Sequence, residues 1–258
     1  MKAFLRVSMA VGRVTWNEIL RDKALYNIVL FALLLFGVSL AASTLTFITP
    51  ERVVLDFGFS AINISCAMVA ILNGSSLLAK EFDRRTIFVA LARPITRTQF
   101  VSGKFSGLCG IILINWLMLS SLETALYLYL GGAWSATYGL TLFLLLLQSW
   151  VLAALAIFFS SFVTTSVSVI ILIGLYLIGN NVSGLQTLLN KMDEGLLRSM
   201  IHFGSYFIPN LEYFNLGFKV TYALPVSWNF TLLSIGYALL LMVLSMAGAG
   251  RLLQGRES

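Results

Sequence analysis

The chain has 258 residues, of which 59% are hydrophobic and 11% charged, and its mean hydropathy is +0.90. Soluble domains carry about 45–50% apolar and about 25% charged residues. Residues 124–190 are 67 consecutive positions without a charged side chain. As helix they would measure roughly 100 Å, or about three crossings of a 30 Å hydrocarbon core. A soluble globule is excluded, and so is a single membrane anchor, because apolar stretches recur from residue 28 to residue 250. We expect an all-α membrane protein that forms one domain over residues 1–258.

Residues 1–23 are expected to form an amphipathic helix in the membrane interface. A cleavable signal peptide would place its apolar core directly after the first charges. Lys2, Arg6, Arg13, Asn17 and Arg21 lie on one side of such a helix, and Phe4, Val7, Val11 and Val14 lie on the other. Trp16 suits the level of the lipid headgroups.

Six membrane-spanning helices are expected to follow. They cover residues 26–48, 57–79, 105–130, 139–159, 166–183 and 228–250. Thr49-Pro50 ends the first span and Gly131-Gly132 the third, while Ser and Thr pairs within 160–165 predict a tight turn between the fourth and fifth. The fifth span is near the lower length limit for a crossing.

The net charge of +6 is informative through the placement of the positive residues. With a cytoplasmic N-terminus, 13 of the 17 Lys and Arg residues lie in cytoplasmic segments and four lie outside. This bias is typical of multi-pass proteins of a bacterial cytoplasmic (inner) membrane with the positive side inside. Both termini are therefore expected in the cytoplasm.

Residues 184–227 are not expected to be a span, because they interleave six charged side chains with aromatics and with Pro209 and Pro225. Charges at that density are costly in hydrocarbon. The stretch Leu196–Phe207 is nevertheless too apolar for a free loop. We expect one or two short helices that dip into the outer leaflet or pack on its surface; a seventh and eighth span is the alternative.

The cytoplasmic loop 80–104 carries a short predicted helix. It begins near Lys80 and ends by Arg93, because Pro94 disfavours helix at the residue before it. Phe82, Thr86 and Val89 share one face of this helix. A solvated connector that only sets the membrane topology is the alternative interpretation.

This loop resembles the signature of the ABC-2-type transporter permeases, the membrane subunits of ATP-binding-cassette exporters. The matching residues are Glu81, Arg84-Arg85-Thr86, Ile87–Leu91, Pro94, Thr96-Arg97 and Gly103-Lys104, with Arg-Thr in place of the commoner Gly-Thr. The stretch Pro209–Asn215 is similar to one in the permease group of nitrous-oxide-reductase maturation.

The resemblance implies that the loop helix is a coupling helix, docked on a cytoplasmic ABC ATPase subunit present in two copies. Phe82 and Val89 are the candidates for the docked face, and Glu81, Arg84 and Arg85 for polar contacts; Thr86, Pro94 and Arg97 complete the candidate coupling residues. The chain lacks the Gly-x-x-x-x-Gly-Lys-Ser/Thr phosphate-binding motif. ATP and Mg are therefore expected on the partner subunit, with no cofactor bound directly.

Glu123 is the carboxylate placed well inside a predicted span, nearer its outer end. It is a candidate for the translocation path or a gate; the alternative is that it snorkels or hydrogen-bonds a neighbour. Asn63 and Asn115 are further candidates for a path between two permease copies, although such amides more often join helices. Gly107 and Gly110 permit close helix approach.

We therefore expect the permease subunit of an exporter, not itself catalytic, that works as a homodimer and moves a lipid, glycolipid or hydrophobic peptide. Neither a catalytic motif nor a metal-binding cluster is found, and the chain has a single histidine, His202. Membrane lipid and periplasmic or accessory membrane proteins are possible partners, and nucleic acid is not. A membrane scaffold or assembly factor without transport, or a secondary transporter, is the alternative.

Overall fold

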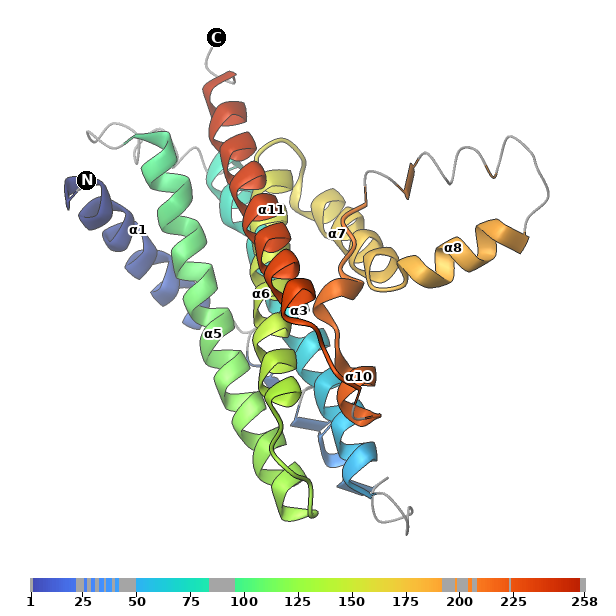
Figure 1. The fold of residues 1–258 in the computed structure, drawn as a ribbon. Coiled ribbons are helices and arrows are strands. Elements are labelled where there is room, and N and C mark those ends of the chain that lie inside the picture. Colours follow the sequence, from blue (N-terminus) through green and yellow to red (C-terminus); the bar gives the residue numbers. More distant parts are fainter. Residues whose placement is uncertain are drawn as a thin grey trace.

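The computed structural model describes residues 2–21, 50–83, 96–191, 208–222 and 224–255, and also 26, 29–30, 33–34, 36–38, 40–41, 198 and 204–205. Regular structure within these residues is helical (Figure 1). The elements are α1 (Lys2–Leu20), α3 (Pro50–Asp83), α5 (Arg97–Tyr129), α6 (Ala136–Ser160), α7 (Thr165–Gly179), α8 (Val182–Lys191), the 3-10 helix η1 (Glu212–Phe214), α10 (Gly217–Thr221) and α11 (Trp228–Gly255).

Helix α6 lies at the centre of the bundle and packs against α3, α5, α7 and α11. Its buried face is built from leucines and from small residues, among them Ala153, Ala154 and Ala156. Gly74 of α3 faces Ala156, and a Cβ at Gly74 would stand 2.6 Å from the Ala156 methyl carbon. Because lipid tails are as apolar as leucine, helices in a membrane associate through such close van der Waals packing.

Four helices in the described part of the chain are long and apolar enough to cross a membrane. They are Pro50–Leu78, Thr98–Tyr129, Ala136–Ser160 and Trp228–Leu252. The bent pair α7 and α8 makes a fifth if it is counted as one broken span. The structure thus supports four to five spans, and the first expected span, 26–48, lies largely outside the described residues.

The fifth expected span, 166–183, is not one straight helix. Helix α7 ends at Gly179, and α8 continues from Val182 at an angle of 74° to it. Figure 1 shows α8 pointing sideways, away from the bundle. This break was not predicted from the sequence, because a hydropathy profile shows no difference between a helix that bends at Gly179-Asn180-Asn181 and a helix that continues straight to residue 183.

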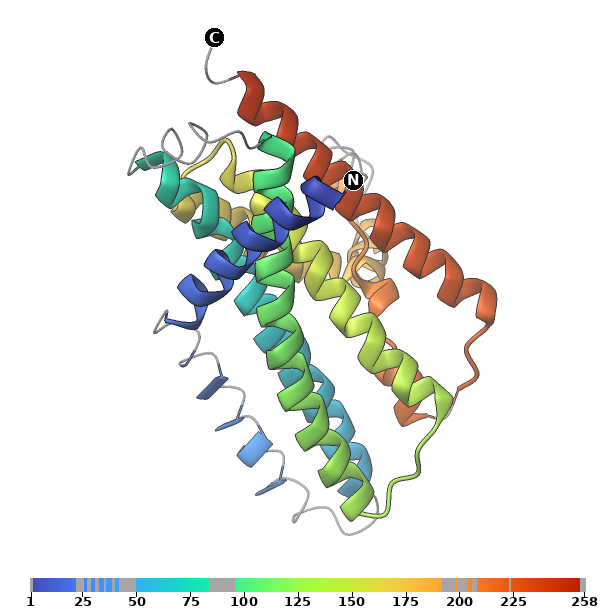
Figure 2. The ribbon, with the colours of Figure 1, turned by 90° about the vertical axis from the view of Figure 1, so that its left-hand side faces the viewer.

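Helix α1 packs along α5 and crosses it (Figure 2). The face in contact is mostly made of small side chains, since Gly103 and Gly107 of α5 lie against Val11, Gly12 and Thr15 of α1. The Ser8 hydroxyl pairs with that of Ser102 at 3.0 Å. This face is not the expected apolar stripe: Val11 takes part, but Val14 is 67% exposed in the chain alone.

Lys104 is buried, although the sequence places it at the end of the cytoplasmic loop 80–104. Its ammonium lies 3.4 Å from Glu18 Oε2 of α1 and 5.8 Å from the centre of the Phe100 ring. The lysine side chain is 4% exposed and the glutamate 51%. Because a half-exposed pair is screened by solvent, this pair fixes the register of α1 on α5 more than it adds stability.

A methyl group at Gly107 should weaken the α1–α5 contact. A Cβ at this position would stand 2.6 Å from the Gly12 carbonyl oxygen, so the two backbones must separate. We expect Gly107→Ala to lower the free energy of unfolding by about 1–3 kcal/mol, as overpacking does, measured by thermal unfolding in detergent micelles. Gly236→Ala in α11 is the control, because nothing lies within 4 Å of its added Cβ. Equal melting temperatures for the two variants would contradict this packing.

Candidate functional site

A cavity of about 450 Å³ opens between α3 and α7, and we call it the amide pocket. It is lined by Ser60, Asn63, Ile64, Ala67, Met68 and Ile71 of α3, by Ile173, Tyr176 and Leu177 of α7, and by Asn180, Asn181 and Asn215 from the segments that follow α7 and η1. No charged side chain is among these lining residues.

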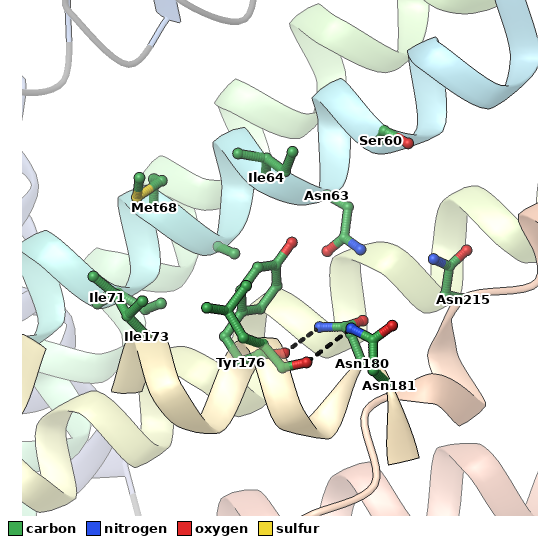
Figure 3. Close-up of a pocket in the computed structure, with 12 residues that line it drawn as sticks. Ser60, Asn63, Ile64, Met68, Ile71, Ile173, Tyr176, Asn180, Asn181 and Asn215 are labelled. Atoms are coloured by element: carbon green, nitrogen blue, oxygen red, sulfur yellow. Dashed lines mark hydrogen bonds between the residues drawn. The ribbon is translucent and has the colours of Figure 1, made fainter. Parts of the chain in front are cut away.

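The amide pocket has a polar end and an apolar end. Figure 3 shows Asn63, Tyr176, Asn180 and Asn181 gathered at one end, while Met68, Ile71 and Ile173 lie at the other. A cavity with this division fits an amphipathic molecule whose polar part is uncharged.

The C-terminal end of α7 forms the polar end of the amide pocket. The Asn180 side chain donates a 2.8 Å hydrogen bond to the Tyr176 carbonyl, and that of Asn181 donates a 2.9 Å bond to the Leu177 carbonyl. These amides supply hydrogen bonds to carbonyl groups at the helix end, where the Tyr176 carbonyl also accepts from the Asn180 N–H at 3.1 Å. Gln148 of α6 in turn donates to the Asn180 Oδ1 at 2.9 Å, which fixes the position of that side chain.

The returning segment 208–216 closes this end. The Leu211 N–H donates to the Gly179 carbonyl at 2.9 Å. Gly179 admits this approach because a Cβ there would stand 2.8 Å from the Pro209 carbonyl oxygen.

Asn63 is the side chain best placed to recognise a ligand. It is 6% exposed, and its Oδ1 has no hydrogen-bond partner within the described part of the chain. A buried acceptor without a partner costs about 1–3 kcal/mol. A hydroxyl, an amide N–H or a water molecule in the amide pocket would remove that cost.

Asn115 lies elsewhere. Its Nδ2 donates to the Ser65 hydroxyl at 3.0 Å and contacts the Cys66 sulfur at 3.5 Å, so that it joins α5 to α3. Of the sequence candidates for a translocation path, Asn63 therefore lines the amide pocket, whereas Asn115 and Glu123 do not.

Glu123 belongs to a separate buried cluster where α3, α5 and α6 meet. Its side chain is fully buried, and its Oε2 accepts a hydrogen bond from the Tyr138 hydroxyl, which also pairs with the Thr124 hydroxyl at 2.7 Å. Its Cγ rests against Gly58, where a Cβ would collide with it. The other oxygen, Oε1, is buried and has no partner among the described residues. The sequence left open whether Glu123 snorkels or hydrogen-bonds a neighbour, and the structure shows the hydrogen bond, to Tyr138. A role of Glu123 in gating stays a prediction.

The candidate coupling residues lie outside the part of the chain whose side chains are described. Residues 84–95, which include Arg84, Arg85, Thr86, Val89 and Pro94, lie outside the described residues, as do the side chains of Glu81, Phe82 and Arg97. The described backbone shows that α3 continues through Asp83 and that α5 begins at Arg97. Thr96 caps α5: its hydroxyl accepts from the Gln99 N–H at 3.3 Å, and the Gln99 Oε1 accepts from the Thr96 N–H at 2.9 Å.

The sequence did not single out Tyr138, Tyr176, Asn180, Asn181 or Asn215 as site residues. Tyr176 and Asn180 are four residues apart, so the sequence alone places them on one face of a helix. Asn215, however, reaches the pocket only because the chain returns to α7 from 36 residues beyond Gly179.

This architecture defines a multi-pass α-helical membrane protein with an uncharged cavity between two of its helices. Residues 35–249 match the sequence profile of the ABC-2 family transporter proteins, and the chain belongs to this family. No curated protein sequence is significantly similar to it. The resemblance to the permeases of nitrous-oxide-reductase maturation stays a prediction.

Removing the Tyr138 hydroxyl should destabilise the bundle. Tyr138→Phe takes away a hydrogen bond from a fully buried carboxyl, and we expect a loss of about 1–3 kcal/mol. The double variant Glu123→Leu/Tyr138→Phe should recover part of that loss, since no polar group is then left unpaired. Unfolding in detergent micelles measures both changes, with Tyr129→Phe, which is 87% exposed, as the control. If the double variant lost as much stability as the sum of the losses in Glu123→Leu and Tyr138→Phe, the two side chains would not interact, which would contradict the Glu123–Tyr138 hydrogen bond.

Proposed function

We propose that the chain is the permease subunit of an ABC exporter and that the amide pocket lies on the path of its substrate. Membership in the ABC-2 transporter family carries this proposal. The uncharged, amphipathic pocket supports it, because no charged group lines the pocket that could couple transport to an ion. ATP hydrolysis then belongs to a separate ABC ATPase, two copies of which act on a permease dimer.

The charge distribution supports an orientation with both chain ends in the cytoplasm. In Figures 1 and 2, α1 begins and α11 ends at the same end of the bundle, which is also where α3 ends and α5 begins. In this orientation Asn63 lies in the outer half of the membrane, and the apolar end of the amide pocket lies closer to the cytoplasmic side.

The pocket chemistry favours a substrate with a hydroxyl-bearing or amide-bearing head and an apolar body. Asparagine side chains both donate and accept hydrogen bonds, so they suit sugars and peptide groups. Met68 and Ile173 offer an apolar surface to the rest of the molecule. A glycolipid or a hydrophobic peptide fits better than an inorganic ion.

A second permease copy is proposed to cover the open side of the pocket. Met68 of α3 and Ile170 and Leu177 of α7 are exposed in the single chain. Ser60 and Asn181, which line the same pocket, present polar groups beside them. Polar groups in hydrocarbon stabilise helix association when they find partners on another helix.

Asn63 should set the affinity for an amphiphile with an uncharged polar head. In a reconstituted permease–ATPase complex, we expect an alkyl glucoside, added below its micellar concentration, to stimulate hydrolysis. Asn63→Leu should raise the concentration needed about fivefold, which corresponds to the loss of one hydrogen bond of about 1 kcal/mol.

Asn73→Leu is the matched control. Asn73 is also a buried amide on α3, but it donates to the Val69 carbonyl at 3.1 Å and does not line the pocket. An unchanged response of the Asn63 variant would remove the amide pocket from the substrate path.

The apolar face of the loop helix should hold the ATPase. We expect affinity purification of the tagged permease to retain an ABC ATPase, identified by mass spectrometry, and Phe82→Asp or Val89→Asp to abolish both its retention and its hydrolysis. Phe82→Leu preserves an apolar side chain and should retain the ATPase. A wild-type permease that purifies without any ATPase would favour a scaffold or a secondary transporter instead.

A further inference from the structure

A second cavity of about 450 Å³ lies on the other side of Asn215 from the amide pocket, and we call it the outer pocket. Its lining comes from α8, η1, α10 and the start of α11: Val182, Ser183, Gln186, Asn210, Glu212, Tyr213, Asn215, Leu216, Phe218, Lys219 and Phe230. Unlike the amide pocket, it contains charged side chains.

The carboxylate of the outer pocket is already engaged. Glu212 Oε1 accepts from the Ser183 hydroxyl at 2.7 Å, and its Oε2 accepts from the Ser183 N–H at 2.9 Å. Ser183 is in the first turn of α8, where unpaired N–H groups and the helix dipole favour a negative charge. Glu212 therefore holds the first turn of α8, and each of its oxygens already accepts a hydrogen bond.

The amide oxygens of the outer pocket are engaged as well. Asn210 Oδ1 accepts from the Glu212 N–H at 3.0 Å, and Asn215 Oδ1 accepts from the Gly217 N–H at 3.1 Å. With these acceptors bound to backbone, the NH₂ groups of both side chains have no partner among the described residues and can donate to a ligand. Two amide NH₂ groups of the outer pocket are thus oriented by backbone contacts of their own oxygens.

Lys219 adds a cation to these donors. Its ammonium lies 4.4 Å from the centre of the Phe230 ring, which holds the charge in place without neutralising it. Within the described part of the chain, no carboxylate comes within 4.0 Å of this ammonium. Donors around a positive charge are the arrangement that recognises a phosphate or carboxylate group.

Apolar surface continues from the outer pocket into the lipid-facing side of α11. Phe218 lines the pocket and is 66% exposed, and Leu233, three residues after Phe230 and therefore near the same side of α11, is 74% exposed. A ligand whose anionic end occupies the pocket can therefore lay a hydrocarbon tail along α11.

We propose that the outer pocket binds the anionic, phosphate-bearing headgroup of a membrane lipid, with Lys219 as its cationic contact. The inference goes beyond transport, since the pocket binds lipid whether or not an ATPase drives the permease.

Native mass spectrometry of the detergent-purified full chain tests the proposal. The protein is incubated with equimolar phosphatidylglycerol and phosphatidylcholine, and the bound lipid is quantified. We expect wild-type protein to retain phosphatidylglycerol preferentially. Lys219→Gln should reduce that preference about fivefold, the effect of one lysine near an anionic lipid.

Lys191→Gln is the matched control. Lys191 also lies in the outer segment, at the exposed end of α8, but it does not line the outer pocket; its variant should keep the wild-type preference. Equal retention of the two lipids, or an equal loss in both variants, would overturn the proposal.

A third arm adds inorganic phosphate at millimolar concentration. If the anionic lipid is the ligand, phosphate should not displace it, because phosphate lacks the hydrocarbon tail. Displacement by phosphate that depends on Lys219 would instead identify a site for a free anion and overturn the assignment to lipid.

Discussion

Helix α7 ends before it has crossed the hydrocarbon, and the architecture around both pockets depends on how that end is satisfied. Its 15 residues extend about 22 Å, whereas the core of a bilayer is about 30 Å thick. Backbone groups freed at this depth find no water, so non-helical backbone is tolerated only where protein or a cavity surrounds it. Three carbonyls at this end have partners: that of Tyr176 accepts from the N–H and the side chain of Asn180, that of Leu177 from the Asn181 side chain, and that of Gly179 from the Leu211 N–H.

The segment that returns to satisfy this break also separates the two cavities. Asn215 lines both pockets, and Glu212, three residues earlier, holds the first turn of α8. The Asn210 N–H donates to the Tyr237 hydroxyl at 3.0 Å, which attaches the segment to α11. A displacement of α11 would therefore move the common wall of the amide pocket and the outer pocket together. One short stretch of irregular chain thus links an uncharged site inside the bundle to a charged one at its edge.

The long helices were predictable because their signals are local. Uncharged runs bounded by charged residues or by Gly, Ser and Thr turn signals predict helices that overlap α3, α5, α6 and α11, and Gly107 predicts a close helix approach to α5, which α1 makes. The break at Gly179 was not predicted, although the fifth expected span was short and contained two adjacent asparagines near its end. The burial of Lys104 was missed for a different reason: its ammonium pairs with Glu18, 86 residues away, and no local pattern reports such a pairing.

The polar residues within the membrane show why the site itself could be predicted only in part. Asn63, Asn115, Gln148 and Glu123 are equivalent in a hydropathy profile, and each is buried. Each also retains one oxygen without a partner among the described residues. What distinguishes Asn63 is the empty volume beside it, which exists because α7 stops and α8 turns away. Asn115 instead meets Ser65, and Glu123 meets Tyr138, so that their polar groups join helices. A polar residue in a helical bundle becomes a binding residue through the shape of the space next to it, and that shape depends on contacts far apart in the sequence.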